Sequence, residues 1–191
     1  FIAYFVSHLT LQLGLSLVTA GVVYAFGHGA GIVGRIAWGA VADRWQKTAK
    51  KIEGVSRETL ETSAAMYLAE KAVMKKHGAS GITINCLGGF YGGHIHAYPC
   101  LGFYELNNRA QVGGCECDLR SAAAMTALGI LTQGRPGYIS DPVIDTAKRQ
   151  IIYAHCVAAN KAFGPKGATN PFQILTHSED RQGASVRSEL P

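Results

Sequence analysis

The chain has 191 residues, of which 48% are hydrophobic, and this composition excludes a disordered protein while the length allows one ordinary domain. Its 18 Lys and Arg exceed its 13 Asp and Glu only mildly, and its basic residues form only short clusters such as Lys47, Lys50 and Lys51. A nucleic-acid-binding protein would gather its positive charge on one face, so no nucleic-acid partner is expected.

Residues 1–34 hold no Asp, Glu, Lys or Arg. They are longer than the run of about 20 apolar residues that crosses a bilayer, and their glycines would let membrane helices approach closely. A buried core helix is the alternative interpretation. We expect residues 1–44 to form an apolar, transmembrane-like helical segment, and the initial Phe1 suggests a piece of a longer protein.

Gly39, Asp43 and Arg44 form the pattern G-x-x-x-D-R at the point where this apolar segment is expected to meet a polar loop. With Arg35 before it, the pattern resembles the cytoplasmic helix-loop-helix signature of major facilitator superfamily transporters, although that family's Gly-Arg-Arg continuation is absent. The resemblance implies fewer than two membrane helices of a transporter. Such a segment forms no transport pathway, so we expect no transport.

Residues 45–191 have the pattern of a soluble α/β domain. Ser56 is a good helix N-cap, Glu58 suits the positive end of the helix dipole, and His77-Gly78 is a typical helix end. A helix is therefore predicted between Ser56 and His77.

The rest of this domain alternates between predicted strands and helices, with a glycine-rich loop after the first strand. The alternation indicates an α/β fold with a mainly parallel sheet and flanking helices. A turn is expected around Asp145, and loops or a short final element beyond Gly164. The predicted elements are strands at 81–87, 111–117, 138–142 and 149–156, and helices at 100–108 and 121–132.

Reactive side chains follow three of these strands, and in such sheets ligands bind at the carboxyl ends of strands. Carboxylate oxygens favour hard cations and imidazole favours transition metals, so a divalent ion such as Mn²⁺ is expected there. The candidate residues are His94, His96, Glu116, Asp118, Asp141, His155 and His177.

Each candidate also has a purely structural interpretation. Glu116 and Asp118 would share one face of a strand, and two carboxylates on an apolar strand need either a metal or a buried cation such as Arg120. The histidines would otherwise be a core residue at a strand end or polar residues of exposed loops.

The five cysteines are odd in number and irregularly spaced, which argues against a disulfide framework. Cys115 and Cys117 lack the second pair that a structural zinc site would show, so we expect them to be buried packing residues. Reduced thiols in a cytosolic protein are the favoured interpretation.

Several spaced motifs carry a second resemblance. The runs NCLGGFYGGHIHAYPCLGFYELN (85–107), GCECDLRSA (114–122) and SDPVIDTAKRQIIYAHC (140–156) occur in this order. They resemble the C-terminal part of the L-fucose and L-arabinose isomerase superfamily, and are closest to its fucose isomerase-related members. With AKKIEGVSRETL just upstream, the resemblance covers residues 45–191.

This resemblance implies a cytoplasmic aldose–ketose isomerase, a homo-oligomer acting on a fucose- or arabinose-type monosaccharide with a divalent metal, usually Mn²⁺. In that superfamily two acidic residues and a histidine hold the metal, and carboxylates move a proton between C1 and C2 through an enediol. By motif, Glu116 and Asp118 match the acidic residues as ligands or bases, and the histidine is either His155 or His177. His94, His96 and Asp141 are then expected to bind the substrate.

The chain also departs from that superfamily, whose members carry large N-terminal domains and complete their sites between subunits. Only part of a site, without an intact activity, is therefore expected. The two resemblances meet near residues 43–45, which predicts either two unrelated segments joined in one chain or a membrane-tethered sugar sensor without catalysis. A purely structural α/β remnant is the third hypothesis.

Overall fold

The computed structural model describes residues 2–189 of the chain. Helices account for 49% of the residues and strands for 15%, which confirms the mixed class expected from the sequence. The chain divides into two units, Phe1–Ala40 and Val41–Pro191. The change of sequence character at residues 44–45 lies inside the helix that runs through this boundary.

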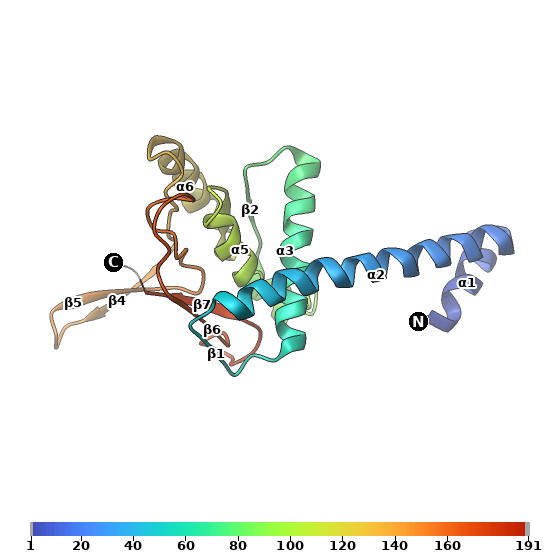
Figure 1. Ribbon diagram of the computed structural model, residues 1–191, viewed down its shortest axis with the longest axis horizontal. Helices are drawn as coiled ribbons and strands as arrows, with labels where there is room; N and C mark the ends of the chain where they lie inside the picture. The colour runs from blue at the N-terminus through green and yellow to red at the C-terminus, as the bar shows by residue number, and fades with distance from the viewer. Residues whose placement is uncertain (1, 190–191) are drawn as a thin grey trace. The chain divides into compact units, whose positions relative to one another are not determined.

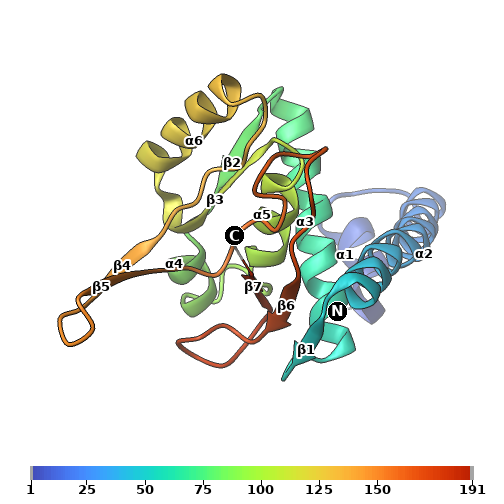
Figure 2. The same ribbon diagram turned by 60° about the vertical axis from the view of Figure 1, so that its left-hand side comes forward.

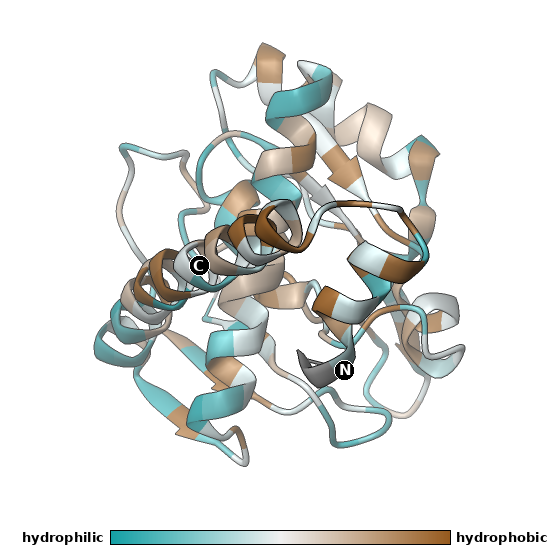
Figure 3. Cartoon of the chain, turned by 90° about the vertical axis from the view of Figure 1, so that its right-hand side faces the viewer, coloured by the Kyte–Doolittle hydropathy of each residue, from teal (hydrophilic) through white to brown (hydrophobic). Residues whose placement is uncertain are grey.

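The first unit consists of α1 (Ile2–Leu11), a turn with Gly14 at φ +67, and most of α2 (Leu17–Thr48). α2 is long and apolar enough to cross a membrane, and only 6% of its most apolar stretch is buried. Val18, Phe26 and Val33 are between 68% and 78% exposed. Apolar side chains are therefore exposed along this segment. Brown bands mark the hydrophobic residues of the N-terminal helices in Figure 3.

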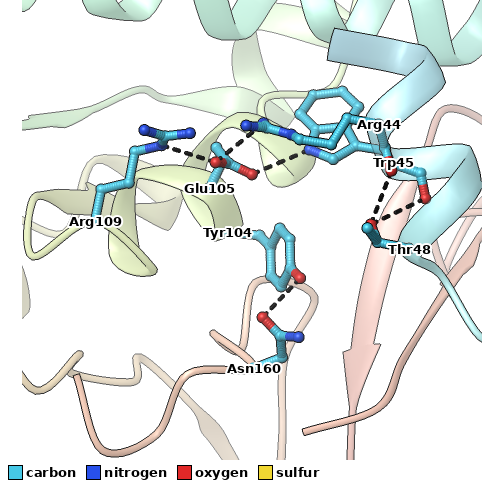
Figure 4. Close-up of polar contacts among 7 residues, drawn as sticks. All are labelled: Arg44, Trp45, Thr48, Tyr104, Glu105, Arg109 and Asn160. Carbon is cyan, nitrogen blue, oxygen red and sulfur yellow. Dashed lines mark hydrogen bonds and ion pairs between the residues drawn. The ribbon is translucent and has the colours of Figure 1, made fainter. Parts of the chain in front are cut away.

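The last turns of α2 belong to the second unit and bind α5 (Cys100–Asn107). Glu105 accepts hydrogen bonds from Trp45 Nε1 at 3.2 Å and Arg109 Nε at 2.8 Å, and it pairs with Arg44 at 3.0 Å (Figure 4). The predicted polar loop at Asp43 and Arg44 is wrong, because the helix continues to Thr48. Burial of Trp45 and its bond to Glu105 hold these turns in helical form.

α3 (Arg57–His77) agrees with its prediction at both ends. Ser56 Oγ accepts from the amide of Thr59, and Gly78 ends the helix at φ 61, a left-handed conformation that glycine adopts without strain. α5 also lies where it was predicted, and every one of its residues is buried. It packs against α3 and β3, and forms the centre of the second unit (Figure 1).

The strands of the described residues form three small sheets, which Figure 2 shows. β1 (Lys51–Glu53) pairs with β6 (Phe172–Leu175) and β2 (Gly81–Thr83) with β3 (Val112–Gly114), both in parallel. β6 pairs with β7 (Ser185–Ser188), and β4 (Asp141–Asp145) with β5 (Gln150–Ala154), both antiparallel. Parallel pairing, predicted for most of one sheet, is therefore limited to two of the four strand pairs.

Two predicted strands are shorter than expected, because a helical segment begins inside each. After β2, Asn85 caps α4 (Cys86–Tyr91) by accepting from the amide of Gly88, so part of the predicted glycine-rich loop is helical. After β3, Cys115–Cys117 form a 3₁₀ turn, η1, and α6 (Leu119–Leu131) follows.

Candidate functional site

The hairpin of β4 and β5 places Asp141 beside His155. Asp141 is the first residue of β4 and pairs with Ala154, the last residue of β5, so that His155 follows directly at the base of the hairpin. The amide of Lys148 donates to Asp145 Oδ1 at 3.0 Å and fixes the turn at the other end. The turn was predicted around Asp145. The pairing of β4 with β5 in this register brings Asp141 and His155 together.

Glu116 reaches the same place from the η1 turn that follows β3. Its backbone has φ 59 and ψ 26, a left-handed conformation that is uncommon for a residue with a Cβ and that often occurs at functional sites. Its Oε1 lies 3.6 Å from His155 Nε2, and Asp141 Oδ2 lies 3.8 Å from the same nitrogen. One ligand atom from each of the three residues lies within 4.8 Å of the others.

His177 completes this wall from the segment after β6. Its ring is buried, stacks on Tyr98 at 5.0 Å between centroids, and holds Nδ1 3.6 Å from Asp180 Oδ1. Among the described residues, this nitrogen has no hydrogen-bond partner. A pocket of about 480 Å³ is lined by Glu116, Asp141, His155 and His177, together with Tyr138 and Arg187.

The pocket wall favours positive charge on its histidines. The pKa of His155 is raised to about 9, mainly by the hydrogen bond with the Cys156 thiol, and Glu116 and Asp141 add to the rise while burial opposes it. The pKa of His177 is also raised, first by Cys156 and then by Asp180. A raised pKa keeps a proton on these rings near neutral pH, and a bound metal ion would have to displace it.

Four thiols form a cluster that reaches the pocket through Cys156, and the sequence did not predict that they meet. The Cys100 thiol donates to Cys156 Sγ at 3.5 Å, and Cys156 Sγ lies 3.4 Å from His155 Nδ1. Hydrogen bonds from Cys100 and then from Cys115 hold the pKa of Cys156 well below its ordinary value. A hydrogen bond with Cys115 lowers the pKa of Cys86 to about 6.

All five cysteines are free thiols. Cys115 is buried, as expected, whereas the expectation that Cys117 is a buried packing residue is wrong, because this side chain is exposed after the left-handed turn. The four clustered thiols come from α4, α5, η1 and the end of β5. Their long sequence separations hide the cluster from any local motif.

Asp118 does not share a strand face with Glu116, because β3 ends at Gly114 and the chain turns. Its carboxylate caps α6 by accepting from the amide of Ser121 at 2.9 Å, and hydrogen bonds from Ser121 lower its pKa. Asp118 does not line the pocket that Glu116 lines.

His94 and His96 are exposed in the segment after α4. His96 lines a separate pocket of about 200 Å³ beside Glu58 and Phe90. The structure thus brings Glu116, Asp141, His155 and His177 together and leaves the other three candidates outside.

The donor set fits a divalent cation. Two carboxylate oxygens and an imidazole nitrogen converge, and a buried, unpartnered imidazole nitrogen of His177 lies on the same pocket wall. Mixed oxygen and imidazole ligands suit ions such as Mn²⁺, and a carboxylate in such a site can also serve as a general base.

Comparison with known proteins gives a similarity to a sugar isomerase. A sulfoquinovose isomerase from Alkalicoccus urumqiensis is 24% identical over 145 residues, which cover 70% of this chain and 32% of that protein. The chain thus spans about a third of the length of the relative it matches. No protein-family profile and no solved structure match the chain.

Proposed function

We propose that residues 45–191 form the metal-binding part of an aldose–ketose isomerase that acts on a monosaccharide. The convergence of Glu116, Asp141 and His155 on one pocket carries this proposal. The similarity to a sugar isomerase supports it, and a pocket of about 480 Å³ is large enough for one sugar ring.

In this mechanism Glu116, Asp141 and His155 hold a divalent ion of the Mn²⁺ class. A bound ion of this kind would supply Lewis-acid polarisation of the sugar carbonyl. Glu116, which is 44% exposed at the pocket wall, moves the proton between C1 and C2 on the enediol route. His177 binds a sugar hydroxyl through Nδ1, which has no hydrogen-bond partner among the described residues and lies 3.6 Å from Asp180 Oδ1.

The rest of the substrate pocket is supplied by protein outside this segment, because the chain spans only about a third of its relative. A second subunit of a homo-oligomer is one source of these walls. We propose a fucose- or arabinose-type sugar as the substrate, and sulfoquinovose, named for the relative, is the third sugar to compare.

The metal site is tested by Mn²⁺ binding, followed through the loss of the free-ion electron paramagnetic resonance signal. The double variant Glu116→Gln with Asp141→Asn should weaken binding by about tenfold or more, because both carboxylate ligands are lost. Asp118→Asn is the matched control, since Asn is an equally good N-cap and the residue lies outside the pocket. Unchanged affinity in the double variant, or a loss in the control, would contradict this ligand set.

A membrane-tethered sugar-binding module without catalysis is the second candidate, favoured by the exposed apolar surface of α2. The two candidates differ in turnover. With Mn²⁺ present, the full chain is incubated with fucose, arabinose and sulfoquinovose. Conversion of any sugar supports the isomerase. Saturable sugar binding that needs no Mn²⁺ and gives no conversion supports the module, which would then lie at the cytoplasmic face.

A further inference from the structure

His155 separates two chemically different groups of ligands. Its Nε2 faces the carboxylates of Glu116 and Asp141, whereas its Nδ1 lies 3.4 Å from Cys156 Sγ. The Sγ atoms of Cys115 and Cys156 and one His155 ring nitrogen all lie within 4.8 Å of one another. Cys100 Sγ lies 3.5 Å from Cys156 Sγ and adds a further donor atom.

We propose that Cys115, Cys156 and His155 Nδ1 form a second metal site, which takes a thiophilic divalent ion of the Zn²⁺ type. Sulfur and imidazole nitrogen are the ligands that such ions prefer, in tetrahedral arrangement. Cys156 lines the pocket, so an ion reaches the site from there.

The spacing of the donor atoms agrees with one bound ion. Tetrahedral ligands at about 2.3 Å for sulfur and about 2.0 Å for nitrogen lie roughly 3.5–3.8 Å apart. The distance of 3.4 Å between Cys156 Sγ and His155 Nδ1 is close to the sulfur–nitrogen value. The donor atoms of Cys115, His155 and Cys156 lie within 4.8 Å of one another, so they would approach by at most about 1 Å to bind one ion.

A metal ion bound at one site weakens metal binding at the other, because both sites use the His155 ring. This inference rests on the proposed function. A hard ion on Nε2 needs the ring proton on Nδ1, from which it can be donated to Cys156 Sγ. A thiophilic ion on Nδ1 needs the proton on Nε2, which then faces Glu116 and Asp141 as a donor. Each ion thus weakens the binding of the other, and the coupling is reciprocal.

The thiol site is tested with Cd²⁺ on the full chain, followed by the ultraviolet absorption that appears when thiolates bind the ion. One Cd²⁺ per chain is expected, with affinity reduced by about tenfold or more in Cys115→Ser and Cys156→Ser. Cys117→Ser, a neighbouring but exposed thiol, should bind as the unaltered chain does. Equal binding by all three variants overturns the site.

A measurement on the unaltered chain covers variants that fail to fold. Alkylation of each thiol is followed by mass spectrometry with and without Cd²⁺. The ion should slow the alkylation of Cys156 at least about tenfold and leave Cys117 unaffected, because Cys156 becomes a ligand and Cys117 does not. Equal protection of both thiols, or of neither, overturns the proposal.

The two proposals fail in distinguishable ways. The Glu116→Gln and Asp141→Asn variant should keep its Cd²⁺ absorption, because the thiol site does not use the carboxylates. If the unaltered chain binds Cd²⁺ but no Mn²⁺, the proposed function fails and the thiol site stands. If it binds both ions with no mutual weakening, the antagonism through His155 is overturned.

Discussion

The protonation of Glu70 depends strongly on the buried surroundings of its carboxyl group. Both carboxyl oxygens are buried and have no hydrogen-bond partner among the described residues. A Cβ at Gly102 would overlap this carboxyl, so the glycine in α5 makes room for it. Burial raises the pKa of Glu70 well above its ordinary value, which favours the neutral acid in the folded chain.

This raised pKa predicts a pH-dependent stability. Because the folded state holds the Glu70 proton more tightly, protonated Glu70 contributes to the free energy of unfolding. This contribution is complete below the ordinary glutamate pKa and is lost as the pH rises through the pKa of Glu70 in the folded state. Glu70→Gln should remove this loss of stability, which amounts to roughly 1.4 kcal/mol for each unit by which the pKa is raised. Urea unfolding at pH 5 and pH 8 measures it.

The control for this prediction is Glu58→Gln, which changes an exposed glutamate on the same helix. It should leave the difference between pH 5 and pH 8 as it is in the unaltered chain. A Glu70→Gln variant with that same difference would show that the carboxyl is not the source.

Single residues also show what the sequence could and could not predict at the site. Residue type and the predicted strand ends drew attention to Glu116, Asp141 and His155, which the structure brings close together. The role of Asp118 as an N-cap was missed, since the turn at Cys115–Cys117 depends on local backbone conformation. The thiol cluster was missed because only the tertiary fold joins its members.

At the scale of elements, the helices with capping signals were predicted best. α3 begins and ends at local signals that a sequence displays directly, namely Ser56 and Gly78. β1 and β6 were not predicted, because each has only three or four residues and they pair across more than half of the chain. Their partners are set by the packing of the whole unit.

The N-cap of α3 allows a quantitative prediction. Ser56→Ala removes the acceptor for the Thr59 amide and should lower the free energy of unfolding by about 1 kcal/mol. Ser56→Asp keeps an acceptor at the same position and should restore most of the loss. Urea unfolding of the three chains measures the difference, and equal loss in both variants would exclude the cap as the cause.

At the scale of the whole molecule, the two units differ in what they expose. The first unit presents apolar side chains to the surroundings, whereas the second encloses a core around α5. The sequence predicted this contrast from the distribution of charges alone. It did not predict that the final turns of α2, with Trp45, belong to the core of the second unit.

This contrast predicts the effect of removing residues 1–40. The full chain should sediment with membranes and need detergent for extraction, because the exposed α2 surface favours lipid. The chain from Val41 keeps Trp45 and its bond to Glu105, and should remain in the supernatant with its helical circular dichroism. Sedimentation of both chains alike would contradict a tether in the first unit.

The left-handed backbone conformation of Glu116 costs folding stability, whereas its carboxylate is needed for the proposed site. Glycine would adopt φ 59 without strain, and a residue with a Cβ costs about 1–2 kcal/mol there. A lineage selected only for a durable protein would drift toward glycine at position 116. Glutamate at position 116 in descendants of this chain would therefore indicate continued selection on the site. Glycine at that position would indicate that this selection has been lost.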